Sequence, residues 1–181
     1  MLVTVIAACE VAFWVVLGLG LFARYGLRKA RLGGVLLLLV PVVDLVLLGV
    51  TTADLKNGGE IGIAHGLAAV YLGVSVGFGH QIIRRMDAWA AHRFDGAPRP
   101  ARPPKYGRER AAHEARQWSR HLLAWAVGCG LLGLAILHVG DAARTEVLGG
   151  LIRLWTLVLG IDAAVSFSYT LAPKRAKGVE R

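Results

Sequence analysis

The chain has 181 residues, of which 55% are hydrophobic and 18% are charged, with a formal net charge of +9. So large an apolar share excludes an ordinary water-soluble domain of this length. This excess of basic residues does not indicate nucleic-acid binding, because basic residues between apolar segments set membrane topology and contact anionic headgroups.

Five apolar segments follow one another along the chain, each close to the roughly 20 residues that cross a hydrocarbon layer. Their apolar character is continuous and forms no stripe of helical period, which is typical of helices surrounded by lipid and by one another. Because backbone polar groups must be satisfied internally in lipid, the segments are predicted to be helices. The sequence thus predicts an all-α membrane protein with five transmembrane helices in one bundle, forming a single domain over residues 1–181. The predicted spans are residues 2–22, 32–52, 61–83, 121–139 and 147–171.

The charges in the connections predict the orientation of these helices. The connection 23–31 has four bases and no acid, and the connection 84–120 has ten bases against four acids. The two other connections are poor in bases, whereas the tail 172–181 has four. The positive-inside rule therefore places the N-terminus outside and the C-terminus in the cytoplasm. The Ala-, Gly-, Val- and Arg-rich composition favours a bacterial inner membrane.

The connection 84–120 is predicted to be a basic linker on the cytoplasmic face, in three parts. Residues 84–94 continue the third span as a short amphipathic helix for the headgroup surface. Residues 96–107 contain four prolines and form a semi-rigid strap, either a linker or a partner-binding peptide. Residues 108–120 form a charged helix that leads into the fourth span.

Small residues in the third and fourth spans predict that these two helices form the centre of the bundle. Gly73 and Gly77 are four residues apart, as are Ala124 and Gly128. This spacing lets helix backbones approach closely in lipid.

Ionisable residues inside membrane helices are costly and are therefore candidates for function. At a rise of about 1.5 Å per residue, Glu10, Asp44 and Arg153 all lie roughly 9 to 12 Å below the outer surface. Asp162 lies in the inner half. The three outer residues predict either a buried ion pair that fixes helix register or a site that handles a proton or cation. In the second alternative Asp44 and Glu10 are the ion-binding groups and Arg153 is the counter-charge. A third alternative is that they face different neighbours.

Four histidines lie in the third and fourth spans. Antiparallel packing would bring His65 opposite His138 near the outer face and His80 opposite His121 near the inner face. Two such pairs resemble the axial ligands of a di-haem cytochrome, which makes b-type haem an alternative. At 100° per residue, His80 is within about 60° of His65, but His138 is about 100° from His121. The other interpretation is interfacial or helix-bonded imidazoles. No zinc spacing is present, so no metal site is predicted.

The sequence contains no nucleophile elbow, Walker loop or paired catalytic carboxylates, and so predicts no catalytic residues. The leading interpretation is a membrane protein that handles an ion, a proton or a small solute, alone or within a larger assembly. Five spans make a poor complete carrier, so a homo-oligomer or a membrane partner is expected. The alternatives are a b-type haem electron carrier and a structural or regulatory membrane subunit.

Three stretches of the sequence carry a family resemblance: "PVVDLVLLGVTTADL", "HGLAAVYLGVSVGFGH" and "PPKYGRERAAHE". They resemble the small uncharacterised bacterial integral membrane proteins of the YmcC type, from the first span through the fourth. That family has no assigned activity, so the resemblance implies the membrane arrangement and no catalytic residues. It singles out Asp44, His65 and His80 as positions to test.

Overall fold

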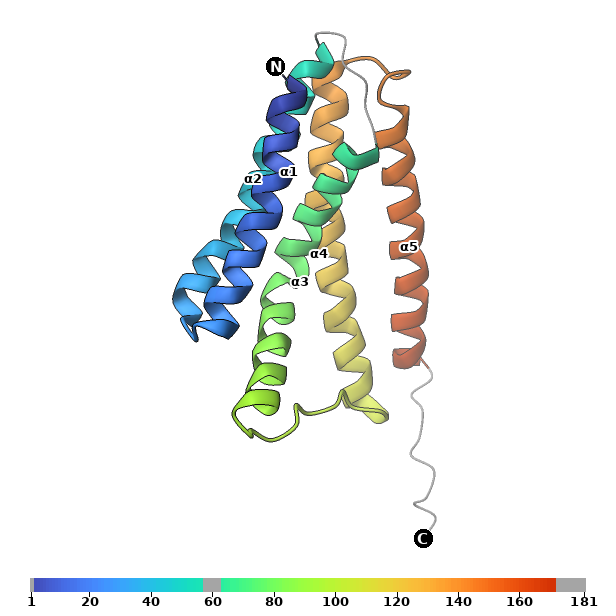
Figure 1. The fold of residues 1–181 in the computed structure, drawn as a ribbon. Helices are drawn as coiled ribbons and strands as arrows, with labels where there is room; N and C mark the ends of the chain where they lie inside the picture. Colours follow the sequence, from blue (N-terminus) through green and yellow to red (C-terminus); the bar gives the residue numbers. More distant parts are fainter. Residues whose placement is uncertain (1, 57–62, 172–181) are drawn as a thin grey trace.

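The computed structural model describes residues 2–56 and 63–171. These residues form five α-helices and one short π-helical turn, and they contain no strand. The all-α prediction is therefore confirmed for this part of the chain. Successive helices run in opposite directions (Figure 1). The elements are α1 (Leu2–Leu21), η1 (Phe22–Gly26), α2 (Ala30–Lys56), α3 (Ile63–Phe94), α4 (Gly107–Val139) and α5 (Glu146–Leu171).

The bundle has two distinct ends. The α1–α2 turn, the α3–α4 connection and the end of α5 lie at one end, which we call the linker end (Figure 1). The start of α1 and the α4–α5 turn lie at the other, which we call the N-terminal end. At the N-terminal end α4 stops at Gly140, whose φ of 69° is left-handed and whose N–H bonds the Ile136 carbonyl oxygen at 3.0 Å. Glycine adopts this conformation without steric cost and so ends the helix.

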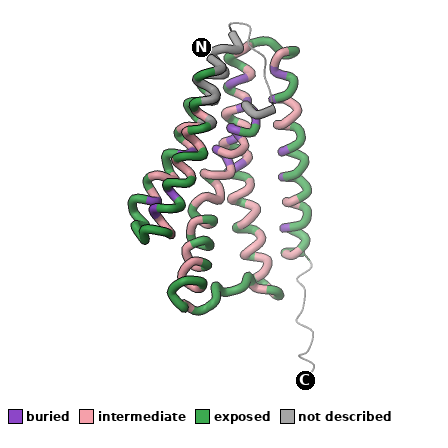
Figure 2. The backbone as a smooth tube through the Cα atoms, in the orientation of Figure 1, coloured by how far each residue is buried: buried purple, intermediate pink, exposed green. Residues whose placement is uncertain are grey.

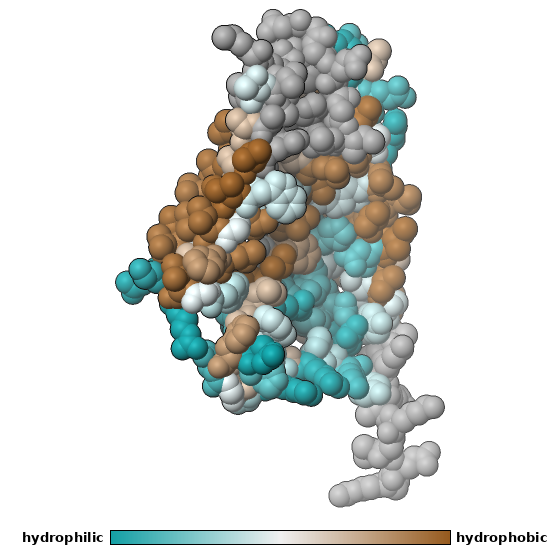
Figure 3. All heavy atoms as spheres, in the orientation of Figure 1, coloured by the Kyte–Doolittle hydropathy of each residue, from teal (hydrophilic) through white to brown (hydrophobic). Residues whose placement is uncertain are grey.

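Three of the described helices, α3, α4 and α5, are each long and apolar enough to cross a membrane. In α1 and α2 the apolar stretches among the described residues are shorter, Val11–Gly26 and Ala30–Val43. Apolar side chains cover the middle of the face seen in Figure 3, and polar side chains gather toward the linker end. The protein is thus a helical membrane protein, and five spans with a defined orientation stay predictions.

The helices α3 and α4 extend well beyond the predicted spans. The helix α3 runs without a break to Phe94, and α4 already begins at Gly107. The helical parts predicted for residues 84–94 and 108–120 are therefore confirmed, and the proline-containing strap joins them. At about 1.5 Å per residue, each of these helices is longer than a hydrocarbon layer is thick.

The predicted close packing of α3 and α4 is confirmed by the space around their glycines. A Cβ atom at Gly73 would lie 2.3 Å from the carbonyl oxygen of Ala124, and one at Gly77 would lie 2.6 Å from that of Arg120. Only glycine allows such an approach. The helix α5 packs on α4, whereas α1 pairs with α2, which in turn contacts α3.

The hydrophobic core lies where α3, α4 and α5 meet, in the half of the bundle nearer the N-terminal end (Figure 2). Its buried members come from all three helices and are mostly aliphatic. Burial of such side chains within the bundle holds the three helices in fixed register. The cluster consists of Ala69, Leu72, Leu132, Ala135 and Leu148.

Candidate functional site

Two ionisable residues that the sequence analysis singled out meet between α4 and α5. His121 Nδ1 lies 2.8 Å from Asp162 Oδ2, and Trp155 Nε1–H donates to His121 Nε2 over 3.1 Å. An indole N–H can only donate, so His121 Nε2 must carry a lone pair. Nδ1 therefore carries the proton and donates it to the carboxylate. His121 is held as a neutral imidazole between a carboxylate and an indole.

The spacing along α5 explains why Trp155 and Asp162 reach the same imidazole. They are seven residues apart, which is close to two full turns, so both side chains leave the same face. The side chain of His121 is 18% exposed and that of Asp162 is 38% exposed. On α3, the ring of Phe78 lies 6.4 Å from the His121 ring in an edge-to-face arrangement. Three helices thus fix the position of one histidine.

Two glycines form the seat for the Trp155 indole. A Cβ atom at Gly128 of α4 would lie 2.3 Å from Trp155 Cζ3, and one at Gly73 of α3 would lie 2.9 Å from Trp155 Cη2. The small residues that predicted close helix packing therefore also admit a large side chain from the third helix. Trp155 is only 9% exposed in this seat. Its indole N–H is thereby directed at His121.

A second hydrogen bond joins α4 to α5 one turn away from His121. Trp125 Nε1–H donates to Thr156 Oγ1 at 3.0 Å, and this hydroxyl donates to the Ile152 carbonyl oxygen at 2.7 Å. Neither side chain titrates near neutral pH. The pair provides a neighbouring interhelical contact without acid–base chemistry.

One face of α4 is polar from the linker end as far as His121. At 100° per residue, its members lie within about 60° of His121. They are Arg110, Glu114, Gln117, Trp118 and His121, which we call the polar stripe.

Side chains of the polar stripe contact one another and the end of α5. Arg110 and Glu114 form an ion pair of 2.5 Å, with side chains 28% and 17% exposed. The Arg110 guanidinium lies 5.0 Å from the centre of the Tyr169 ring, and Trp118 meets Phe167 edge-to-face at 5.2 Å. The stripe therefore faces the end of α5 and is not a solvated surface.

An ion pair at the linker end connects η1 to α3. Arg24 Nε donates to Asp87 Oδ1 at 2.7 Å, Arg24 Nη2 bonds the other carboxylate oxygen, and the Tyr25 hydroxyl donates to Oδ1 at 3.2 Å. Asp87 lies four residues beyond the apolar segment that ends at residue 83. The hydrogen bonds from Arg24 lower the pKa of Asp87, and burial raises the pKa of Tyr25.

Sequence reasoning missed the pairing of Arg24 with Asp87, because it treated these residues as separate topological charges. A signal was nevertheless present in the sequence. Both residues follow the end of a predicted span by a few positions on the same side of the membrane. Opposite charges at one level of neighbouring helices are candidates for a pair.

The other predicted site residues are not brought together by the described structure. Arg153 is exposed on α5, a helix that packs mainly on α4 and also contacts α3. The side chains of Glu10, Asp44 and His65 lie outside the described residues, so their pairing with Arg153 or with one another stays a prediction.

The haem alternative also stays a prediction. His80 and His138 are exposed, and α3 places Phe78 rather than His80 against His121. Both nitrogens of His121 have hydrogen-bond partners in this arrangement. The described residues contain no group of three His, Cys, Asp or Glu that could hold a metal ion.

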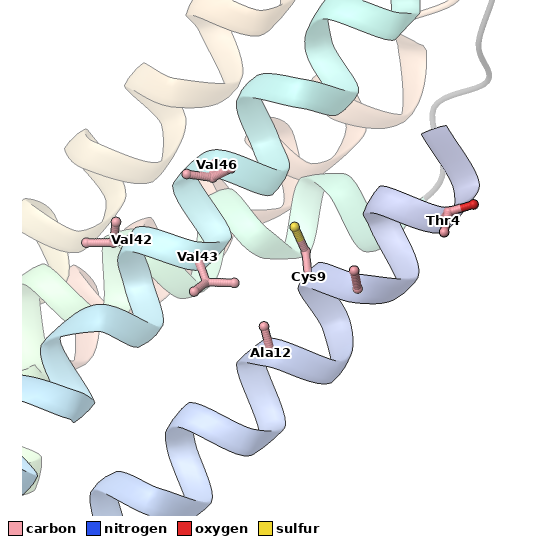
Figure 4. A pocket seen from close by; sticks show the side chains of 7 residues that line it. Thr4, Cys9, Ala12, Val42, Val43 and Val46 are labelled. Carbon is pink, nitrogen blue, oxygen red and sulfur yellow. The ribbon is translucent and has the colours of Figure 1, made fainter. Parts of the chain in front are cut away.

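A groove of about 490 Å³ lies between α1 and α2 (Figure 4). Cys9 borders it. Among the described residues, the lining contains no carboxylate, imidazole, ammonium or guanidinium group. The lining residues are Thr4, Ala8, Cys9, Ala12, Val42, Val43 and Val46.

Among curated proteins, the chain is similar to a Bacillus subtilis (strain 168) protein named "Uncharacterized membrane protein YmcC". The two are 43% identical over 175 residues, which cover 95% of this chain and 92% of the relative. No protein-family model matches the chain, and no solved structure matches it. The relative's name states a membrane location and no activity, so function must be argued from the geometry.

Proposed function

The chain belongs to the YmcC family of membrane proteins, and from that premise we propose that it binds and releases a proton within the membrane at His121 and Asp162. The observation that supports this proposal is the hydrogen-bonded chain from Asp162 through His121 to Trp155. An ionisable pair between membrane helices is a candidate for function because its charged state is costly there.

The proposal places all five helices across a bacterial inner membrane, with the linker end in the cytoplasm. The alternation of helix directions and the excess of bases at the linker end support this orientation. The bases at that end would contact anionic headgroups of the inner leaflet.

The depth of the site supports a role inside the membrane. The Arg24–Asp87 ion pair lies at the level of the α1–α2 turn, which we take as the headgroup level. Phe78, which contacts His121, precedes Asp87 by nine residues on α3. At about 1.5 Å per residue, His121 lies about 14 Å farther into the bilayer than the ion pair.

Uptake of a proton by His121 would change the helix interface. A second proton can bind only at Nε2, because Nδ1 already carries one. The resulting N–H would face the indole N–H of Trp155, and two donors cannot share a hydrogen bond. The Trp155 bond would therefore break, while the bond to Asp162 would become a charge-assisted pair. Binding and release of the proton would thus alternate between two arrangements of the α4–α5 contact.

Nitrogen NMR of the histidine side chains tests the proposal. The chain has six histidines, so the ¹⁵N-labelled protein in lipid nanodiscs gives a small set of signals that His121→Gln assigns. We expect His121 to show the neutral tautomer with the proton on Nδ1 near neutral pH, and to convert reversibly to imidazolium on acidification. Trp155→Phe should change the Nε2 signal and leave Nδ1–H bonded to Asp162.

The matched control is Trp125→Phe, which removes the neighbouring α4–α5 hydrogen bond without touching His121. It should leave the His121 signals and their response to pH unchanged. A His121 that keeps its neutral signal until the protein unfolds would contradict the proposal. So would a neutral tautomer with the proton on Nε2.

A further inference from the structure

We infer that water reaches His121 from the linker end along the polar stripe of α4, so that the proton-binding site opens toward the cytoplasm and is closed on the opposite side. This inference rests on the proposed proton binding and adds the route that serves it. Three observations carry it: the stripe, a group of buried polar atoms without partners, and the packing beyond His121.

The polar stripe is unusual for a face that packs against other helices. A membrane helix normally packs with small and apolar residues. Here Glu114 and Gln117 precede His121 by seven and four residues on the same face of α4. The side chains of Glu114 and His121 are less than one-fifth exposed. A continuous row of hydrogen-bonding groups thus lies inside the bundle.

Buried polar atoms without hydrogen-bond partners lie along the same route. They are Gln81 Oε1, Trp118 Nε1 and Arg110 Nε, on α3 and α4. Such an atom destabilises the fold if it stays unbonded, and buried polar groups are normally satisfied by protein or by ordered water. All three lie on the linker side of the layer of Phe78 and His121. Among the described residues no such atom lies on the other side of that layer.

The route ends at His121, because the same face of α4 becomes tightly packed directly beyond it. Ala124 and Gly128 are buried there, and the Cβ atom that Gly73 lacks would lie 2.3 Å from the Ala124 carbonyl oxygen. The apolar core cluster follows. Among the described side chains, this face of α4 continues toward the N-terminal end with the buried Ala124, Gly128, Leu132 and Ala135 and with no row of polar groups, so a proton on His121 would return to the side from which it came.

Thiol reactivity in intact vesicles tests this route. The native cysteines Cys9 and Cys129 are first replaced by alanine. Four variants with one cysteine each are then made and compared in two pairs. The two members of a pair lie at the same depth in the bundle. We place two residues on the route: Gln81, four residues beyond Gly77 on the face of α3 that packs on α4, and the buried Ser166, four residues beyond Asp162 on α5. Their neighbours on the outer surface are Ile82 and Val165. The reagent is Ag⁺, which is small enough to follow a file of water molecules and reacts with hydrated thiols.

For both pairs, the proposed route predicts the opposite order of reaction rates from the one that exposure in the protein alone would give. Ile82 and Val165 are 50% and 51% exposed in the protein, whereas Ser166 is 2% exposed. If lipid covers the outer surface and water follows the stripe, Gln81→Cys and Ser166→Cys should react at least tenfold faster than Ile82→Cys and Val165→Cys. The faster reaction should occur with Ag⁺ on the linker side. Ser166→Cys is nearly isosteric, so this pair remains informative if Gln81→Cys perturbs the fold.

Three outcomes would overturn the inference: equal rates within both pairs, faster reaction at the outer residues, or faster reaction from the N-terminal side. The measurement is repeated with Asp162→Asn, which should leave the thiol rates unchanged because water access does not require the proton site. The two proposals can therefore fail separately. Fast reaction along the route with no protonation of His121 would remove only the proposed function, and the reverse pattern would remove only the route.

Discussion

The two halves of the packed face of α4 differ in chemistry although they meet the same two helices. Toward the N-terminal end this face consists of buried small and aliphatic residues, Ala124, Gly128, Leu132 and Ala135. Toward the linker end it is the polar stripe, with an ion pair, an amide, an indole and His121. One half therefore fixes the positions of the helices, and the other half supplies the acid–base chemistry. Trp155 connects them, because its ring sits in the glycine seat and its N–H bonds His121.

The largest expected effect comes from filling the glycine seat. In Gly128→Ala, the new methyl group would meet Trp155 Cζ3 at 2.3 Å and the Ala69 carbonyl oxygen at 3.0 Å. Overpacking of this kind costs about 1 to 3 kcal/mol. We expect a corresponding loss in the free energy of unfolding, measured by denaturant titration in mixed micelles. We also expect the His121 signals to change, since Trp155 must move.

Gly130→Ala on the same helix is the matched control. A Cβ atom at Gly130 meets nothing within 4 Å. This substitution should leave stability nearly unchanged or raise it slightly, because alanine has the higher helix propensity. If both alanine variants behaved alike, the packed half would not be positioning Trp155.

A smaller effect is expected from the ion pair that we place at the headgroup level of the polar half. Asp87→Asn removes the charge that receives three hydrogen bonds from Arg24 and Tyr25. The Asp87 side chain is 41% exposed, so solvent screens the pair and the expected loss is about 1 kcal/mol. The control is Asp95→Asn, because Asp95 forms a more exposed pair with Arg28. An equal loss of unfolding free energy in the control would show that the Arg24–Asp87 pair does not hold α3 at a fixed depth in the membrane.

The same ion pair predicts a dependence of stability on pH. Arg24 holds the pKa of Asp87 below its ordinary value, so the folded protein binds this proton less readily than the unfolded chain. The stabilisation is fully present above the unfolded pKa of about 3.9 and is lost as the pH falls through the lower folded value. The free energy of unfolding should therefore fall below about pH 4 in the wild type and fall less in Asp87→Asn.

Much of the fold could be predicted from the sequence, because apolar segments of membrane length and small residues four apart constrain helices strongly. The helical linker parts and the central α3–α4 contact follow from these patterns. Of the residues at the site, the sequence predicted two, in separate roles, and missed Trp155 and Phe78. Asp162 and His121 were both candidates, but their pairing depends on the rotation of α5 against α4, which the Trp155 seat sets. Hydropathy and spacing carry no information about that rotation, and a buried tryptophan in an apolar segment looks like ordinary packing.

The smallest predicted effect is at the boundary between the two halves. Thr156→Val removes the hydroxyl that accepts the Trp125 N–H and keeps the shape of the side chain. Hydrogen bonds between membrane helices contribute about 0.6 kcal/mol on average, so a double-mutant cycle with Trp125→Phe should give a coupling near that value. Proton binding at His121 should stay the same in all three variants, because neither residue touches the imidazole. If instead any of these variants altered the His121 signals, the polar half of α4 would extend one turn farther, to Trp125 and its hydrogen bond to Thr156 of α5.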